Sequence, residues 1–253
     1  MQELYYREMG EGSPLIILHG LFGASDNWLT LGRRFAENHK VYLVDQRNHG
    51  QSFHSDEFSY EAMAQDLEQF MTRHNIEQAD ILGHSMGGKT AMVFATTWPE
   101  RVKKLLVADI GPQSYLVHHT TILKGLFSIN LDTLASRKAA DEQLTEYIPE
   151  MGIRQFLLKN LTRKGEGFGW KINLPVIASS IEQIGKGLNQ NTSYGKTALF
   201  VRGRRSDYIQ DADINLIHSI FTNSKVETIE GAGHWLHAEK PQEFYDIASN
   251  YLQ

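Results

Sequence analysis

Residues 81–88 read Ile-Leu-Gly-His-Ser-Met-Gly-Gly and carry the strongest structural signal in the chain. The pattern Gly83-x-Ser85-x-Gly87, with an apolar run before it, is typical of a nucleophile elbow, a sharp turn from a strand into a helix. Such a turn strains the backbone at Ser85 and lifts its hydroxyl above the sheet. A side chain at position 83 or 87 would collide with the neighbouring backbone, whereas glycine has none. We therefore predict a strand, a tight turn and a helix here, with Ser85 as a nucleophile.

Short apolar runs like the one before Ser85 recur along the chain. Runs of this length, bounded by Gly, Asp or Asn, are typical of buried strands in a parallel sheet, and stretches with helical periodicity lie between them. One helix is predicted after Ser59 as N-cap, and the last helix begins at Pro241. The alternation predicts an α/β fold with a mostly parallel, doubly wound sheet. The predicted strands contain residues 15–18, 41–44, 81–82, 105–108, 198–201 and 226–229.

One region, approximately residues 112–191, interrupts this alternation. Its apolar residues recur at helical spacing, and no stretch within it has a convincing strand pattern. A connection of ~80 residues is long for a link between two strands. We therefore predict one domain over residues 1–253 with a helical cap inserted at about 112–191; the alternative is a series of ordinary crossover helices.

Ser85 needs a base, because a free serine hydroxyl is a poor nucleophile until its proton is removed. Ligands of an open parallel sheet bind beyond the carboxyl ends of its strands. His234 follows the last predicted strand on the glycine-rich loop Gly231-Ala232-Gly233, which makes it the best candidate. His237 lacks a preceding glycine and is the weaker one.

Attack on a carbonyl creates a negative oxygen that needs two donors aimed at it. The N–H of Met86, at the start of the helix after the elbow, is one candidate. The other is the N–H of Leu21, in the loop that follows the first predicted strand. We predict that these two backbone groups form an oxyanion hole.

Four motifs in this order resemble those of the α/β-hydrolase superfamily: His-Gly-Leu-Phe-Gly at 19–23, Asp-x-Arg-x-His-Gly-x-Ser at 45–52, Gly-His-Ser-Met-Gly-Gly at 83–88 and Gly-His-Trp at 233–235. A narrower resemblance, to the YbfF-like esterases, is carried by residues 25–28, 45–50 and 108–112. The resemblance covers most of the chain and is weakest in the cap. It implies a serine hydrolase that cleaves small-molecule acyl esters or thioesters, acyl-CoA included, without cofactor or metal. Carbon–carbon bond hydrolases and perhydrolases share these motifs.

The acid that orients His234 has two candidates. In many members of the superfamily it lies three residues after the glycine that ends the penultimate strand. Ser206 occupies that place here, and Asp207 is displaced by one residue. Asp109 follows the strand after the nucleophile helix, a second position from which this fold supplies its acid. We place Asp109 first and Asp207 second, with Ser206 as a helper that bonds His234.

Several aromatic and histidine side chains lie near these motifs. Phe22, Trp28, His84 and Trp170 are candidates for substrate contacts, although buried aromatic residues are equally typical of a core. The Leu, Ile and Phe content of the cap indicates an acyl chain in the substrate. His19, Asp45, Arg47 and His49 are expected to brace loops. The chain has 11 histidines but no grouping with metal-ligand spacing, and the adjacent His118 and His119 are expected to be solvated.

Two other function classes compete with the hydrolase. Residues Gly83–Thr90 also fit the phosphate-binding pattern G-x-x-x-x-G-K-[ST], which would make the chain a P-loop-type NTPase. That hypothesis leaves the loops containing His19 and His234 unexplained, and it would make Lys89 a phosphate ligand instead of an ordinary helix residue. A non-catalytic α/β-hydrolase-like binding protein is the third class.

Composition excludes several partners. The 253 residues suffice for a full hydrophobic core, and a net charge of −5 gives no attraction to nucleic acid. No apolar run approaches the ~20 residues of a membrane span. The first residues show no secretory signal and the chain has no cysteine, so we expect a cytoplasmic protein. Nothing in the sequence indicates an oligomeric state.

Overall fold

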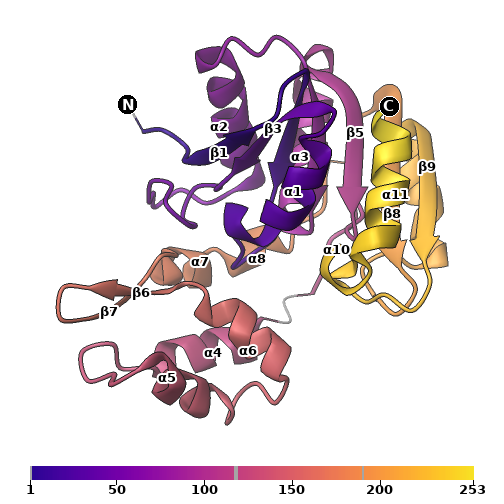
Figure 1. The fold of residues 1–253 in the computed structure, drawn as a ribbon. Coiled ribbons are helices and arrows are strands. Elements are labelled where there is room, and N and C mark those ends of the chain that lie inside the picture. The colour runs from indigo at the N-terminus through magenta and orange to yellow at the C-terminus, as the bar shows by residue number, and fades with distance from the viewer. Residues whose placement is uncertain (1, 117–118, 190) are drawn as a thin grey trace.

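The computed structural model describes residues 2–116, 119–189 and 191–253, and its fold is shown in Figure 1. Within these residues one seven-stranded sheet is formed by β1 (Tyr6–Met9), β2 (Ser13–Leu18), β3 (His39–Val44), β4 (Ala79–His84), β5 (Val102–Ala108), β8 (Tyr194–Gly203) and β9 (Phe221–Ile229). The spatial order is β1-β3-β2-β4-β5-β8-β9; β1 is antiparallel to β3, and the other pairs are parallel. The six predicted strands are confirmed. β1 was not predicted because its sequence, Tyr-Arg-Glu-Met, contains no continuous apolar run.

Helices cover both faces of this sheet. α2 (Tyr60–Arg73), α3 (Met86–Thr97) and α9 (Ile214–Ile220) contribute to the hydrophobic cluster on one face, and α1 (Leu29–Phe35), α10 (Leu236–Glu239) and α11 (Pro241–Leu252) to the cluster on the other. The Ser59 hydroxyl caps α2 by accepting from the Ala62 N–H, and Pro241 lies in the first turn of α11, both as predicted. Short 3₁₀ helices span Ser25–Trp28, Pro99–Arg101 and Asp211–Asp213.

The central strands are apolar on both sides, as expected for strands buried between two helical layers. In β2, Leu15 and Ile17 point into the cluster beneath α1 and α11, whereas Ile16 and Leu18 point into the cluster beneath α2 and α3. All four side chains are at most 1% exposed. This burial fixes the register of the sheet and therefore the position at which each strand delivers its C-terminal loop.

The segment between β5 and β8 lies beyond the end of the sheet toward which the β5 arrow points (Figure 1). Its own cluster includes Leu126, Leu144, Leu157 and Ile177, packed with Met86 and other residues from the sheet side. The predicted helices are present, but so is a two-stranded hairpin that the sequence did not indicate, because its first strand is largely polar. The elements are α4 (Thr120–Ser128), α5 (Arg137–Leu144), α6 (Met151–Leu158), β6 (Leu161–Lys164), β7 (Gly167–Trp170), α7 (Leu174–Ser179) and α8 (Ile181–Ile184). We call this segment the cap.

Lys89 joins both ends of the cap to the helix that follows Ser85. It lies in α3 and is fully buried. Its Nζ donates to the carbonyl oxygens of Gln113 (2.5 Å), Lys186 (2.9 Å) and Pro112 (3.3 Å). The two ends also bond each other, since the Leu188 N–H donates to the Pro112 carbonyl at 2.8 Å. The sequence suggested that Lys89 is an ordinary helix residue, and this was wrong. Its side chain instead connects the cap to α3.

No helix in the described ranges has the length and apolar character needed to cross a bilayer.

Replacing Lys89 by Met tests this attachment. The substitution keeps most of the side-chain volume but removes the Lys89 donor from three carbonyl oxygens, of which that of Pro112 keeps the Leu188 N–H. Leaving buried acceptors unsatisfied costs about 1–3 kcal/mol per group. We expect the free energy of unfolding in urea to fall by at least about 2 kcal/mol. Lys124→Met on the exposed face of α4 is the matched control, with little effect expected; equal effects of the two substitutions would show that the attachment contributes nothing.

Candidate active site

Ser85 occupies a strained turn between β4 and α3. Its φ of 52° and ψ of −117° lie in a region that residues with a side chain rarely adopt. A Cβ at position 83 would lie 2.2 Å from the Gly87 carbonyl oxygen, and a Cβ at position 87 would lie 2.3 Å from that of Leu18. Both glycines are therefore required for this close approach of the backbone, as the elbow pattern predicted.

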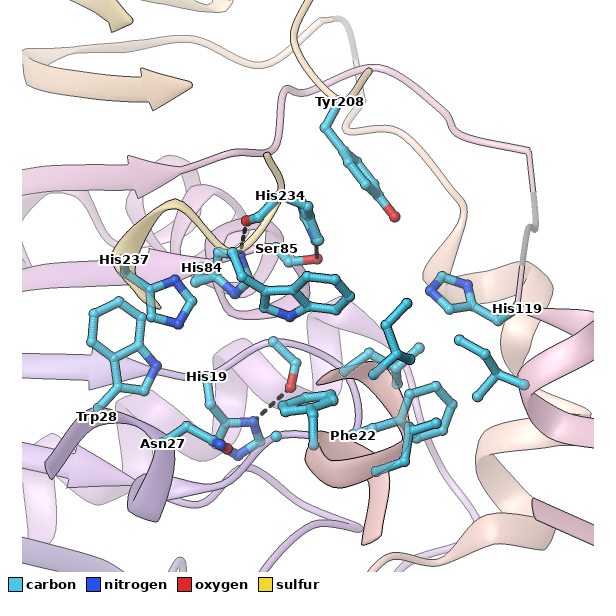
Figure 2. Close-up of a pocket in the computed structure, with 18 residues that line it drawn as sticks. His19, Phe22, Asn27, Trp28, His84, Ser85, His119, Tyr208, His234 and His237 are labelled. Carbon is cyan, nitrogen blue, oxygen red and sulfur yellow. Dashed lines mark hydrogen bonds between the residues drawn. The ribbon is translucent and has the colours of Figure 1, made fainter. Parts of the chain in front are cut away.

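The His234 ring lies between Ser85 and Asp109. His234 comes from the loop after β9, and its Nε2 is 3.0 Å from Ser85 Oγ (Figure 2). Its Nδ1 is 2.8 Å from Asp109 Oδ2. With the proton on Nδ1, the ring donates to the carboxylate and accepts from the serine hydroxyl. Three residues that are far apart in the sequence thus form one continuous chain of hydrogen bonds.

Asp109 is fully buried directly after β5, in a left-handed backbone conformation with φ 50°. Its Oδ1 accepts from the Gly203 N–H at 2.9 Å, and its Oδ2 accepts from the Ser206 hydroxyl as well as from His234. These donors fix the orientation of the carboxylate. The predicted bond from Ser206 to His234 was wrong, because its hydroxyl reaches Asp109 instead.

Asp207, the alternative acid, does not take part in this arrangement. Its side chain is exposed, and its carboxylate lies 3.5 Å from Gln210 Nε2. The one-residue displacement noted in the sequence turns the carboxylate outward and leaves Ser206 facing the site. The structure therefore brings Asp109, and not Asp207, to His234.

Leu21 and Met86 line a small cavity together with Ser85. Met86 is the first residue of α3. Neither amide donates a hydrogen bond to any of the residues that the structure describes. The loop that carries Leu21 is fixed by the neighbouring Phe22 N–H, which donates to His49 Nε2 at 3.2 Å. Both amides are therefore candidates for donors to a ligand oxygen.

Two buried neutral histidines support this loop. Burial lowers the pKa of His19 to about 4 and that of His49 to about 3. Each ring donates through Nδ1 to a backbone carbonyl and accepts a backbone N–H through Nε2, from Gln46 in the first case and from Phe22 in the second. Protonation at Nε2 would break the accepting bond, so the loop geometry requires neutral rings.

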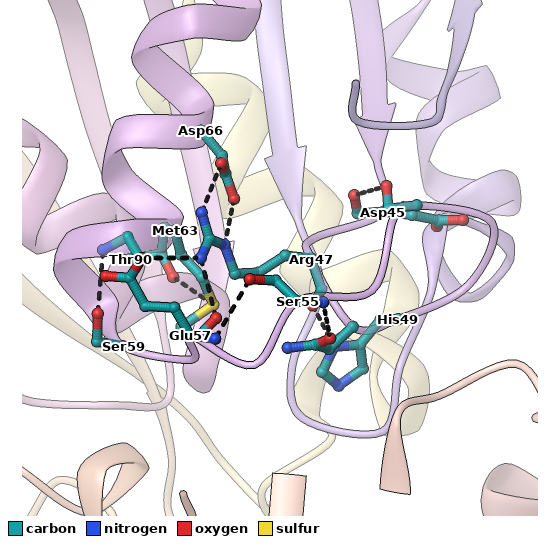
Figure 3. A network of polar contacts seen from close by, with 12 residues as sticks. Asp45, Arg47, His49, Ser55, Glu57, Ser59, Met63, Asp66 and Thr90 are labelled. Atoms are coloured by element: carbon teal, nitrogen blue, oxygen red, sulfur yellow. Dashed lines mark hydrogen bonds and ion pairs between the residues drawn. The ribbon is translucent and has the colours of Figure 1, made fainter. Parts of the chain in front are cut away.

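A second polar network holds the loop that follows β3 (Figure 3). Arg47 forms a bidentate ion pair with Asp66 of α2, with distances of 2.6 and 2.8 Å, and donates to the Glu57 carbonyl at 2.9 Å. The Asp45 carboxylate accepts the N–H groups of Ser25 at 2.6 Å and Gln51 at 2.8 Å. These contacts brace loops around the site, as expected.

A cavity of about 250 Å³ opens beside Ser85 and His234. Phe22, Trp28 and His84 line it, as predicted, but Trp170 does not. Trp170 ends β7 and packs against the hydrophobic cluster of the cap, because the hairpin turns it toward the cap interior. The lining residues that were not predicted are Asn27, His119, Ile122, Ile153, Phe156, Leu157, Tyr208 and Trp235. His118 lies outside the described residues.

Two side chains position the His234 loop. The Tyr208 ring stacks on the His234 imidazole, with centroids 4.0 Å apart and planes at 20°. His84 Nε2 donates to the His234 backbone carbonyl at 2.8 Å. His237, the weaker base candidate, is stacked on Trp28 at 4.3 Å with its pKa lowered to about 3 by burial. His84 was recognisable from its place beside Ser85, whereas Tyr208 gave no sequence signal of its role.

The phosphate-binding hypothesis for residues 83–90 is not supported. Lys89 Nζ is buried against three carbonyl groups, and the Thr90 hydroxyl donates to the Met86 carbonyl within the same helix at 3.1 Å. Neither side chain faces the cavity at Ser85.

Comparison with known proteins agrees with this geometry. Residues 13–120 match the family model described as alpha/beta hydrolase fold. The chain is 37% identical over 246 residues to mouse sn-1-specific diacylglycerol lipase ABHD11, covering 94% of this chain and 80% of that protein. The chain belongs to the α/β-hydrolase family. It is 34% identical over 241 residues to Esterase YbfF of Escherichia coli, covering 95% and 93% of the two chains, so the predicted YbfF-like type is confirmed.

A solved structure extends the comparison to the whole fold. The structure of a marine microorganism esterase superposes with a TM-score of 0.96 at 45% identity, covering 99% of this chain and 100% of that one. The predicted α/β-hydrolase fold is confirmed. With relatives of this kind, the chain is a carboxylesterase-type hydrolase.

The buried histidines predict a dependence of stability on pH. The pKa of His49 is lower in the folded protein than the ordinary value near 6.5, so below that pH the unfolded chain binds more protons. The free energy of unfolding should therefore fall as pH decreases from 7 to 5. His49→Gln should reduce this slope by up to about 1.4 kcal/mol per pH unit. His218→Gln, at an exposed position, is the control. An unchanged slope in the His49 variant would contradict a neutral His49 ring in the folded protein.

Proposed function

We propose that this protein hydrolyses carboxylic esters of small molecules through a covalent acyl-enzyme on Ser85. The observation that carries the proposal is the unbroken chain of contacts from Ser85 Oγ through His234 to Asp109, at 3.0 and 2.8 Å. An activated serine hydroxyl of this kind is the nucleophile of acyl transfer. Thioesters, acyl-CoA among them, would follow the same two steps, and neither step needs a cofactor.

The first step transfers the acyl group to the enzyme. Ser85 Oγ attacks the substrate carbonyl carbon while His234 Nε2 takes the hydroxyl proton. The Asp109 carboxylate holds the ring in the required tautomer and stabilises the imidazolium. The amides of Leu21 and Met86 donate to the negative carbonyl oxygen, a role in which one donor is typically worth about 10²–10³ in rate. His234 then returns the proton to the leaving oxygen as the ester bond breaks.

The second step releases the acid. Water loses a proton to His234 as it attacks the acyl carbon, and a second tetrahedral intermediate with a negative oxygen forms. As this intermediate collapses, His234 returns the proton to Ser85 Oγ, which restores the hydroxyl and frees the carboxylic acid. Tyr208 limits rotation of the imidazole by stacking on it, while His84 holds its backbone. Ser206 and Gly203 keep the carboxylate directed at Nδ1 throughout.

The named relatives support ester cleavage as the reaction. One is a diacylglycerol lipase and another is an esterase, and both names describe hydrolysis of carboxylic esters. A P-loop NTPase would need Lys89 at a phosphate, where it is bonded to three carbonyl groups instead. A non-catalytic binding protein would have no need of an aligned serine, imidazole and carboxylate.

Kinetics of three variants test the assignment of roles. With a p-nitrophenyl ester as substrate, Ser85→Ala should lower kcat by about 10⁶-fold if the three residues act as a unit. Asp109→Asn should lower it by about 10⁴-fold, because the amide favours the wrong tautomer of His234. Asp207→Asn should change kcat by less than about threefold, because Asp207 is exposed and contacts neither residue.

The Asp207 variant is also the matched control for Asp109. A large loss of kcat in Asp207→Asn, with little change in Asp109→Asn, would mean that Asp207 and not Asp109 orients His234. Retention of most activity in Ser85→Ala would refute the acyl-enzyme.

A further inference from the structure

Two cavities meet at Ser85, which lines both of them. The larger, of about 250 Å³, is also lined by His234, Trp235 and Phe156. The smaller, of about 40 Å³, is lined among others by Met86, by Ile181 and Ile184 of α8 and by Ile110 from the loop after β5. Leu21, Ser85, His119 and Tyr208 line both cavities. A substrate carbonyl at Ser85 would therefore direct one substituent into each.

The position of the base distinguishes the two substituents. In the tetrahedral intermediate the reacting carbon carries the Ser85 oxygen, the oxyanion, the leaving oxygen and the acyl chain. His234 must protonate the leaving oxygen, so the leaving group lies on the side of the imidazole. Of the two cavities, the larger is lined by His234 and the smaller is not. Met86, which supplies an oxyanion donor, lines the smaller one.

We propose that the smaller cavity is the acyl subsite, so that this enzyme cleaves esters of short carboxylic acids with bulkier, apolar alcohols. The assignment rests on the function proposed above. One water molecule needs roughly 10–15 Å³ of such volume, so a cavity of about 40 Å³ holds an acetyl or propionyl group and little more. The larger cavity has about six times that volume for the alcohol.

The Ile110 and Ile184 walls of the acyl subsite are held in place by the surrounding structure. Ile110 is 4% exposed and packs against Gly88, where an added Cβ would lie 2.5 Å from its side chain. Ile184, from α8, is 8% exposed, and its carbonyl accepts a hydrogen bond from the buried Tyr60 hydroxyl at 2.7 Å. Lys89 fixes the adjacent Lys186 carbonyl at 2.9 Å. Because these contacts are buried, enlarging the subsite on these two sides for a longer acyl chain would disrupt them.

The alcohol side has a different character. Ile122, Ile153, Phe156 and Trp235 give it a largely apolar wall. No lysine or arginine is found among the described residues that line either cavity. An apolar alcohol fits such a wall, whereas the phosphates of coenzyme A would find no cationic partner there.

Two ester series test the assignment. In the first, p-nitrophenol is the constant leaving group and the acyl chain lengthens from acetate to butyrate to octanoate. In the second, acetate is constant and the alcohol changes from ethanol to benzyl alcohol to octanol. We expect kcat/KM to fall at least about tenfold from acetate to octanoate, because each methylene that does not fit the acyl subsite is worth about tenfold or more. In the second series we expect kcat/KM to rise with alcohol size, because the larger cavity accommodates the alcohol.

The outcomes separate the two proposals. Equal or better turnover of octanoate, or a fall in kcat/KM with increasing alcohol size, would overturn the subsite assignment while leaving the esterase in place. No turnover in either series would refute the proposed function itself. Acetyl-CoA as a better substrate than octyl acetate would also overturn the inference.

Matched cavity variants make the test specific. Ile184→Ala enlarges the acyl subsite and should raise the octanoate-to-acetate ratio of kcat/KM by about tenfold. Ile153→Ala enlarges the alcohol side and should shift preference in the alcohol series without changing the acyl ratio. Ile181→Ala, at a second lining position of the acyl subsite, replaces Ile184→Ala if that variant fails to fold. An unchanged acyl ratio in a folded acyl-subsite variant would contradict the proposal.

Discussion

The turn at Ser85 is the constraint around which the rest of the structure is arranged. Its backbone adopts φ 52°, and Gly83 and Gly87 pass so close to neighbouring carbonyl groups that no side chain fits. Such a conformation costs free energy and persists only where the surrounding structure over-determines it. Here β4 is hydrogen-bonded between β2 and β5, and the Ser85 N–H itself donates to the Ala108 carbonyl at 3.0 Å. The same sheet therefore holds Ser85 and, one residue after Ala108, Asp109.

Most buried polar groups around this turn are hydrogen-bonded, and these bonds fix the positions of the Leu21 loop and of the cap. His19 and His49 stay neutral: His49 accepts the Phe22 N–H from the loop that carries Leu21, and His19, in that loop, accepts the Gln46 N–H from the loop after β3. Lys89 satisfies three carbonyl groups at the ends of the cap from within the nucleophile helix. The cap, the oxyanion loop and the nucleophile are thus linked by buried hydrogen bonds and not only by apolar packing, which is non-directional.

Much of this arrangement could be predicted from the sequence, because it depends on local patterns. The strands appear as short apolar runs, and the Gly-x-Ser-x-Gly pattern identified the turn. The choice between Asp109 and Asp207 stayed open, because a displacement of one residue in a loop does not by itself say where the side chain points. The partner of Ser206, the stacking of Tyr208 on His234 and the position of Trp170 depend on how distant segments meet. Lys89 was misread because its acceptors lie 23 to 97 residues away.

The central claim is that the Ser85 hydroxyl is activated by His234 in this turn. Reaction with a fluorophosphonate, followed by intact-mass and peptide mass spectrometry, tests it most directly. The predicted result is a single adduct on Ser85 that is absent in Ser85→Ala and forms at least about 10²-fold more slowly in His234→Ala. A folded protein that gains no adduct, or carries it on another residue, would contradict the account.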